Sequence, residues 1–176
     1  MLAEKYADEI KGILARFPDK RSAVLPLMHL AQHEYGYTSR EAMREVAEIL
    51  DLDPTHVLSL AGFYTLFHEE PVGKYVLEIC NDLACALRGA DEFVEMATEK
   101  LGVPVDGTTE DGLFTIKTVM CLGACDRAPM LQANLKFHEN LNEEKFEKLL
   151  AQLREESANG RTPPSVVQKI TAYAKR

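Results

Sequence analysis

The sequence predicts an α/β protein in which a bundle of helices precedes a small layer of strands and helices. Apolar residues recur at helical spacing through the first seventy residues, whereas two β-branched runs appear only later, at residues 75–79 and 114–119. A helical pattern lies between these runs and a predicted strand pair follows them, as expected of a small layered α/β fold. Each β-branched run also leads into a pair of cysteines.

The N-terminal part, residues 1–70, is predicted to be all helical. Four helices are expected, over residues 3–17, over residues 24–36, from Thr38 and from Asp53. Thr38 and Glu41 have the spacing of a capping box, which predicts that the third helix opens at Thr38. Asp53 and Pro54 supply a capping carboxylate and a first-turn proline to the fourth helix.

The second part, residues 71–155, begins where Glu70-Pro71-Val72-Gly73 interrupts the helical pattern. Its expected strands cover residues 75–79, 114–120, 130–133 and 135–137. The last two strands are predicted to form a hairpin across Asn134. Its expected helices cover residues 89–101 and a stretch that Asn142 caps. The order of these elements gives the α/β layer.

The third part, residues 156–176, is predicted to be a linker and a tail. Residues 157–164 are rich in Pro, Gly and polar residues. Apolar residues at helical spacing within residues 166–173 suggest a short amphipathic helix. We favour a loosely docked tail over a dedicated partner helix.

Composition and charge exclude several classes of protein. An apolar fraction of 46% with 27% charged residues is typical of a globular chain. The formal net charge of −8 argues against nucleic-acid binding, which needs a basic face. No apolar run approaches the ~20 residues of a membrane span, and the acidic N-terminus is unlike a signal peptide. We therefore expect a reducing compartment, where cysteines bind metal or do redox chemistry more often than they form disulfides.

All four cysteines lie within one stretch of the chain, as the pairs Cys80/Cys85 (C-x4-C) and Cys121/Cys125 (C-x3-C). Two strands that each lead into a cysteine loop can bring four thiolates together. Zinc knuckles prefer C-x2-C and a thioredoxin-type dithiol needs C-x-x-C, so both fit less well. Scattered buried cysteines would not be expected to cluster in this way. The spacing favours a 2Fe–2S cluster, with structural zinc as the alternative.

Residues beside the cysteines would influence such a cluster. Gly123 permits unusual backbone angles that turn amide N–H groups toward sulfur. Asp82 and Asp126 would oppose reduction of a cluster, and Arg88 and Arg127 would offset them. The acidity of the chain favours a low potential.

Other candidate sites are weaker. His29 and His33 lie four apart, as a metal pair would, but no third ligand is near in the sequence, so helix packing or a surface role is favoured. Phe63, Tyr64 and Phe67 are expected to pack in the core or at a hinge rather than on a partner. The chain has no G-x-G-x-x-G fingerprint and no P-loop. No catalytic residues are predicted.

Several motifs together resemble the small 2Fe–2S subunit of respiratory complex I, a thioredoxin-like ferredoxin of the NADH-oxidising module. They occur in order over residues 20–150: Ala23-Val-Leu-Pro-Leu27, Phe63-Tyr-Thr-Leu-Phe67, Pro71-Val-Gly-Lys-Tyr75, Cys85-x-Leu-Arg-Gly89, Asp111-x-x-Phe114-Thr115, Cys121-Leu-Gly-x-Cys125-x-x-Ala128-Pro129 and Glu139-Asn-Leu141. Asn81-Asp82 departs from the Thr-rich first loop of many members, which affects the expected potential but not the ligands.

The resemblance implies a thioredoxin-like domain behind an N-terminal helical bundle, with one 2Fe–2S cluster bound by Cys80, Cys85, Cys121 and Cys125. It implies an electron carrier without its own NADH site. Its partner would be a larger flavoprotein with FMN, NADH and a 4Fe–4S cluster, among further complex I subunits on the cytoplasmic face of the inner membrane. Equivalent subunits of NAD-linked hydrogenases or formate dehydrogenases, and a stand-alone ferredoxin, remain alternatives.

Overall fold

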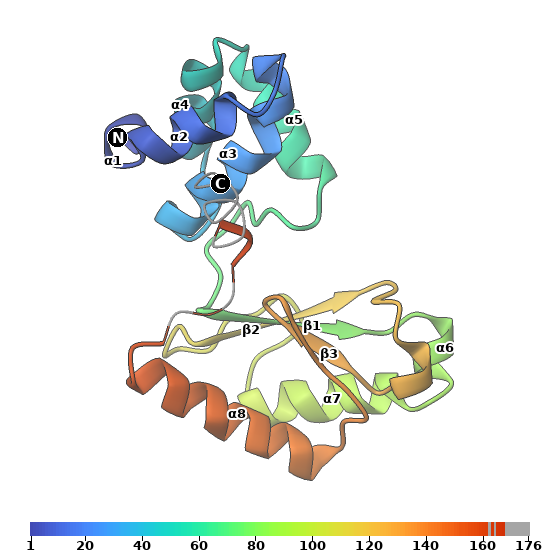
Figure 1. The fold of residues 1–176 in the computed structure, drawn as a ribbon. Helices are drawn as coiled ribbons and strands as arrows, with labels where there is room; N and C mark the ends of the chain where they lie inside the picture. The colour runs from blue at the N-terminus through green and yellow to red at the C-terminus, as the bar shows by residue number, and fades with distance from the viewer. Residues whose placement is uncertain (162, 164, 168–176) are drawn as a thin grey trace. The chain divides into compact units, whose positions relative to one another are not determined.

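The computed structural model describes residues 1–161, 163 and 165–167, and it divides into two compact units (Figure 1). The helical unit comprises Met1–Pro71 together with the described residues from Ser165 on. The sheet unit comprises Val72–Pro164. Each unit has its own apolar core. Of the amphipathic segment expected within residues 166–173, residues 168–173 lie outside the described residues.

The helical unit buries one apolar face of each of its longer helices in a shared core. Its elements are α1 (Leu2–Lys5), α2 (Ala7–Leu14), the 3-10 helix η1 (Lys20–Ala23), α3 (Val24–Tyr35), α4 (Arg40–Leu50) and α5 (Pro54–Phe63). Gly36 ends α3 with a φ of 82°, which the sequence predicted from a glycine at that position. The Asp53 carboxylate accepts from the Thr55 N–H and caps α5, also as predicted.

The first helix is shorter than predicted and is broken. The expected helix over residues 3–17 is interrupted at Tyr6, whose φ and ψ are −120° and 33°, and it ends at Leu14. The Lys5 Nζ and the Tyr6 hydroxyl both bind the Glu34 carboxylate of α3, at 2.7 and 2.8 Å. Both residues lie at the break and contact another helix. The spacing of apolar residues within one helix does not predict such contacts.

The prediction that Thr38 caps the third helix is wrong. Ser39 is the N-cap of α4, because its Oγ accepts from the Ala42 N–H at 3.1 Å. Thr38 is buried, and its Oγ1 donates to the His68 carbonyl at 2.9 Å. Two adjacent hydroxyl residues precede this helix, and tertiary contact decides which of them caps it.

The sheet unit contains four strands in the order β2-β1-β3-β4. Its elements are β1 (Tyr75–Cys80), α6 (Leu83–Ala86), α7 (Ala90–Leu101), β2 (Phe114–Val119), the 3-10 helix η2 (Cys125–Arg127), β3 (Leu131–Ala133), β4 (Lys136–His138) and α8 (Glu143–Ala158). The first two strands are parallel, and β3 runs antiparallel to both of its neighbours. The predicted α/β class is therefore confirmed.

Both long helices, α7 and α8, cover the same face of this sheet (Figure 1). Alternate residues of β1 (Tyr75, Leu77 and Ile79) face them in the core, as the period of two along a strand requires. The hairpin predicted across Asn134 is confirmed, and Asn134 has a φ of 52°. Its side chain accepts from the Val76 N–H of β1 at 2.8 Å and donates to the carbonyl of Lys74, just before β1, at 3.1 Å. The short helix α6 was not predicted.

No helix within the described part of the chain is long and apolar enough to cross a membrane.

Candidate metal centre

The two parallel strands carry both cysteine loops to one edge of the sheet. Cys80 is the last residue of β1 and pairs in register with Val119, the last residue of β2. Cys121 follows β2 by two residues. Parallel neighbours end at the same edge, so the loops that follow them start side by side. The Asn81 N–H also donates to the Val119 carbonyl at 3.1 Å, which keeps the start of the first loop against the second.

The first loop folds back through α6. Asp82 caps this helix through its carboxylate, which accepts from the Leu83 N–H at 2.9 Å. The Cys85 N–H donates to the Asp82 carbonyl at 2.8 Å. This turn returns Cys85 to Cys80, whose thiol is close enough to contribute to the raised pKa of Cys85. Both side chains are buried, with 1% of their surface exposed.

The second loop is more open. Gly123 has a φ of 75°, and its N–H points at the Cys121 Sγ at 3.4 Å. A residue with a Cβ would be strained in this conformation, which is the role that the sequence predicted for this glycine. The Cys121 thiol lies close enough to Cys125 to raise its pKa. Cys121 is exposed and Cys125 is half-buried.

Two contacts join the loops to each other. The Cys80 Sγ donates to the Met120 carbonyl at 2.8 Å. The Arg88 Nε donates to the Ala128 carbonyl at 3.3 Å. The second loop therefore cannot move away from the first without losing bonds from both its start and its end.

Residues just after the β3–β4 hairpin hold the end of the second loop by hydrogen bonds. The Asn140 N–H donates to the Arg127 carbonyl at 2.7 Å, and the Leu141 N–H donates to the Pro129 carbonyl at 2.8 Å. Arg127 also pairs with the Glu139 carboxylate at 2.8 Å. This set of contacts gives a physical reason for the Glu139-Asn-Leu141 motif, which lies far from the cysteines in sequence.

The thiols affect one another electrostatically. Burial raises the pKa of Cys85 to about 12, and the neighbouring Cys80 thiol adds to the effect. The Cys121 thiol is the main cause of the raised pKa of Cys125. Both pKa values also respond to sulfur in the other loop, so all four thiols share one electrostatic environment. Four thiolates in that environment need a compensating positive charge, which metal ions supply.

The donor set fits a binuclear centre. Among the residues that the structure describes, no three His, Cys, Asp or Glu side chains are grouped so as to hold one metal ion. Of the thiols, Cys80 has the largest effect on the pKa of Cys85, and Cys121 has the largest effect on the pKa of Cys125. A mononuclear zinc site needs four ligands at ~2.0–2.3 Å from one atom, whereas a 2Fe–2S cluster takes two cysteines on each of two irons. The four predicted residues lie together, and their role as ligands remains a prediction.

The charged residues beside the cysteines differ in the contacts that they make. Arg127 is already paired with Glu139 and with Asp126. The Asp82 carboxylate is turned to the backbone of α6. Arg88 is a cation that binds a carbonyl between the two loops, so its charge is not cancelled by that contact. Of the two arginines predicted to offset negative charge, only Arg127 is paired with carboxylates among the described residues.

Sequence analysis missed the apolar surface around the loops. Leu83, Leu87 and Met120 flank the cysteines and are 73%, 81% and 76% exposed. Apolar side chains in a loop suggest core residues at first sight. The signal that could have identified them is their position, because each lies within two residues of a cysteine.

The other candidates divide between core and surface. His29 packs on Phe67, with ring centroids 4.6 Å apart, and burial lowers its pKa, so the packing role predicted for His29 is confirmed. Phe67 is buried as expected. Phe63 is 76% exposed, so the expectation that it packs in the core is wrong. His33 is exposed.

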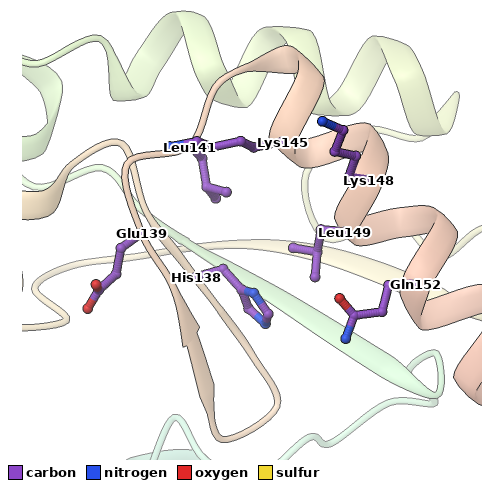
Figure 2. Close-up of a pocket in the computed structure, with 7 residues that line it drawn as sticks. All are labelled: His138, Glu139, Leu141, Lys145, Lys148, Leu149 and Gln152. Carbon is purple, nitrogen blue, oxygen red and sulfur yellow. The ribbon is translucent and has the colours of Figure 1, made fainter.

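A pocket of about 250 Å³ lies between β4 and α8 (Figure 2). It is lined by His138, Glu139, Leu141, Lys145, Lys148, Leu149 and Gln152. Figure 2 shows the Glu139 side chain turned away from His138 and Gln152. The Lys145 Nζ binds the Asn140 carbonyl and the Lys148 Nζ binds Glu144. Both cations are thus already engaged, and no cysteine lines this pocket.

Comparison with known proteins supports the same kind of centre. The sequence profile of the family described as thioredoxin-like 2Fe-2S ferredoxin matches residues 10–154. The E 2 subunit of the NADH-quinone oxidoreductase of Rhizobium meliloti is 41% identical over 147 residues, which are 84% of this chain and 88% of that one. The E subunit of the Rickettsia prowazekii enzyme is 40% identical over 85% of this chain and 86% of its own. The E subunit of the Mycobacterium tuberculosis enzyme is 37% identical over 88% of this chain but only 61% of its own length.

One solved structure shares the fold at low sequence identity. An NAD+-reducing NiFe hydrogenase in the air-oxidized state superposes with a TM-score of 0.64 at 17% identity. The match covers 74% of this chain and 23% of the hydrogenase chain. This likeness concerns the fold alone.

Proposed function

The chain belongs to the thioredoxin-like 2Fe–2S ferredoxin family, and on that premise we propose that it is the electron-transfer subunit of the NADH-oxidising module of an NADH:quinone oxidoreductase. In this proposal Cys80, Cys85, Cys121 and Cys125 hold one 2Fe–2S cluster. The observation that carries it is the convergence of four thiols, in two pairs, at the common end of β1 and β2.

The residues around the centre would do three things. A bound 2Fe–2S cluster supplies a one-electron couple. The buried pair, Cys80 and Cys85, keeps water from one side of the centre. The Gly123 N–H already donates to the Cys121 sulfur, and such bonds to ligand sulfur stabilise the reduced state of a centre. The exposed Cys121 leaves the opposite side open to a redox partner.

The partner would be a larger flavoprotein that binds NADH and FMN and carries a 4Fe–4S cluster, among further subunits of the complex. Leu83, Leu87 and Met120, which lie within two residues of a cysteine in the sequence, have exposed apolar side chains. Exposed apolar side chains near a redox centre are available to a partner protein. We place the assembled complex at the cytoplasmic face of the inner membrane, with this chain peripheral to the bilayer.

The first experiment tests the centre itself. The chain is purified without oxygen, analysed for metals and sulfide, and examined by EPR after reduction with dithionite. We expect about two irons and two sulfides per chain and an S = 1/2 signal. A colourless protein with one zinc would overturn the electron-transfer function.

The ligands are tested one at a time. Replacing any one of the four cysteines by serine should remove or degrade the cluster, because one of the two irons would lose a thiolate. Ala124→Ser is the matched control, since it changes the same loop without touching a sulfur. A cysteine whose serine variant retains full iron content and an unchanged EPR spectrum is not a ligand.

The host complex is tested by mixing the holoprotein with the flavoprotein. NADH should bleach the visible absorption of this chain only when the flavoprotein is present. The second candidate function is that of an equivalent subunit in a hydrogenase. The fold shared with the NAD+-reducing hydrogenase is compatible with this function. Relatives named as subunits of NADH-quinone oxidoreductases favour the first host. The proteins that co-purify with the chain decide between them.

A further inference from the structure

The C-terminal end of α5 and the turn after it hold large apolar side chains outside the core of the helical unit. Phe63, Tyr64 and Leu66 are 76%, 38% and 47% exposed. We call these three residues the Phe63 surface. The sequence predicted that Phe63, Tyr64 and Phe67 pack in the core or at a hinge, and of these only Phe67 is buried. Exposed aromatic side chains close together in space need an explanation, whereas a single exposed leucine does not.

The helix α5 has more apolar residues than the core of the helical unit takes up. Val57 and Ala61 are fully buried in that core, and Leu58 and Leu60 pack against it while partly buried. Phe63, at the C-terminal end of the helix, is not part of this core and is 76% exposed. A large aromatic side chain left outside the core is available for a second contact.

The backbone of the Phe63 surface is held in place by hydrogen bonds. The Gln32 side chain of α3 donates to the Leu66 carbonyl at 2.9 Å and accepts from the His68 N–H at 2.8 Å. The backbone N–H and the hydroxyl of Thr38 both donate to the His68 carbonyl, at 2.7 and 2.9 Å. The turn is therefore ordered before any partner arrives.

The rings are fixed as well. Phe63 and Tyr64 meet edge to face, with centroids 5.0 Å apart. Tyr64 meets the buried Phe67 in the same way at 6.5 Å, and Phe67 packs on His29. Each ring is thus connected to the core. A preorganised aromatic side chain loses little entropy on binding, which is a property of interface hot spots.

The rim of the Phe63 surface is acidic. The Glu69 carboxylate lies over Gly62, since a Cβ at that glycine would stand 3.4 Å from the Glu69 Oε1. Glu70 follows and is exposed. No Lys or Arg occurs between residues 57 and 70. A second copy of the chain would bring like charges together in a two-fold contact, so charge disfavours self-association through this surface.

We propose that the Phe63 surface is a docking site for the flavoprotein, which receives it in an apolar pocket rimmed by Lys and Arg. This inference rests on the proposed function, because that function supplies the partner. The Phe63 surface belongs to the helical unit, whereas the cysteine loops belong to the sheet unit. The helical unit is then an anchor that raises the effective concentration of the centre at its partner.

The first test asks whether the surface is free in the isolated holoprotein. The chain has no tryptophan, so Phe63→Trp introduces a single fluorescent reporter. We expect red-shifted emission and quenching by acrylamide, as for an exposed indole. A blue-shifted emission that resists quenching would mean that the chain covers the surface itself, and it would overturn the proposal.

The second test measures binding of the purified flavoprotein to the wild-type holoprotein and to Phe63→Ser by calorimetry. We expect the Kd to rise at least about tenfold, as for loss of a hot-spot aromatic residue, with the iron content and the EPR signal unchanged. Phe137→Ser is the matched control, because Phe137 is an aromatic residue of the sheet unit that is 43% exposed. This control should bind like the wild type.

A third variant tests the charge of the rim. Replacing Glu69 and Glu70 by lysine should lower the association rate several-fold at low salt, and high salt should reduce the difference. An association rate equal to that of the wild type, or faster, would contradict a basic rim on the partner.

The outcomes separate this proposal from the proposed function. If the wild type binds the flavoprotein and takes its electrons while Phe63→Ser binds equally well, only the docking site is overturned. If the wild type does not bind, both fail. An equal loss in Phe63→Ser and Phe137→Ser would show an unspecific effect and overturn the docking site. A shift from dimer to monomer in Phe63→Ser, measured by sedimentation, would make a second copy the occupant and overturn the proposal.

Discussion

Burial distinguishes the two pairs of cysteines at the level of single residues. Cys80 and Cys85 are almost wholly buried, whereas Cys121 is exposed and Cys125 half-buried. The cause is local: Cys80 ends a strand inside the sheet, whereas the second pair lies in the loop after β2, on either side of Gly123. The solvent side of the centre is therefore the side of Cys121.

Sequence reasoning identified the residues that carry a pattern and missed those that do not. The cysteines were predicted because all four cluster in two spaced pairs. The exposure of Phe63 and Leu87 was not, because an apolar residue at a surface and one in a core look the same in a sequence. Only the tertiary structure shows which face of α5 the core leaves uncovered.

The half-buried His29 predicts a pH dependence of stability. Burial against Phe67 lowers its pKa in the folded chain, while the unfolded value is about 6.5. Above about pH 6.5 both states are neutral and the full stability is present. Below it the unfolded chain binds a proton that the folded chain resists, so the free energy of unfolding falls by up to about 1.4 kcal/mol per pH unit until the folded pKa is reached.

The measurement is urea unfolding of the helical unit, followed by far-UV circular dichroism from pH 5 to 8. His29→Gln should flatten the profile in that range. The exposed His33 lies one turn away, so His33→Gln serves as the control and should retain the wild-type slope. Equal slopes for His29→Gln and wild type would show that other groups cause the acid sensitivity.

At the level of elements, the sequence predicted the strands better than the helix ends. Both parallel strands carry β-branched runs, and Asn134 marks the hairpin. The residues within each strand and turn were therefore sufficient to predict these elements. The four-residue α6 is too short to show a period, and its only signal is the capping Asp82. The break at Tyr6 and the cap at Ser39 depend on contacts with Glu34 and His68, which lie far away in the sequence.

Asn134 connects the hairpin to β1, and its replacement should weaken the sheet. Asn134→Gly keeps the positive φ but removes the side-chain bonds to Val76 and Lys74. At about 1 kcal/mol for each bond, we expect a loss of about 2 kcal/mol in the free energy of unfolding of the sheet unit, measured by urea denaturation.

Asn140→Gly is the matched control for this variant. Asn140 has a φ of 49°, and the bond that it makes to Arg127 comes from its backbone. The control should change stability by much less than Asn134→Gly. Equal losses in the two variants would mean that backbone conformation, and not the bonds to β1, limits stability here.

On the scale of the whole molecule, the candidate metal centre belongs to only one of the two units. Each unit has a separate core, and all four cysteines belong to the sheet unit. The small third cluster of buried residues surrounds Cys80 and Cys85 and includes Ala90, Ala128 and Met130. The centre thus lies at the margin of the sheet unit's main core.

Removal of the cluster should therefore loosen one region only. We expect hydrogen exchange of the reduced apoprotein to rise about tenfold or more over residues 81–89 and 121–128, because the cluster no longer joins these loops. Residues 24–63 of the helical unit should exchange as in the holoprotein. Mass spectrometry of peptides from both forms tests this. A uniform rise across both units would show that the cluster supports the whole chain.

The hydrogen bonds from Asn140 and Leu141 to the second cysteine loop also bear on when a cluster can be inserted during synthesis. These bonds form only after β3, β4 and the turn that follows them have been synthesised and have joined β1. A nascent chain that ends before residue 140 has all four cysteines but lacks the N–H groups of Asn140 and Leu141. We therefore expect a cluster at these cysteines to be inserted late in translation or after it.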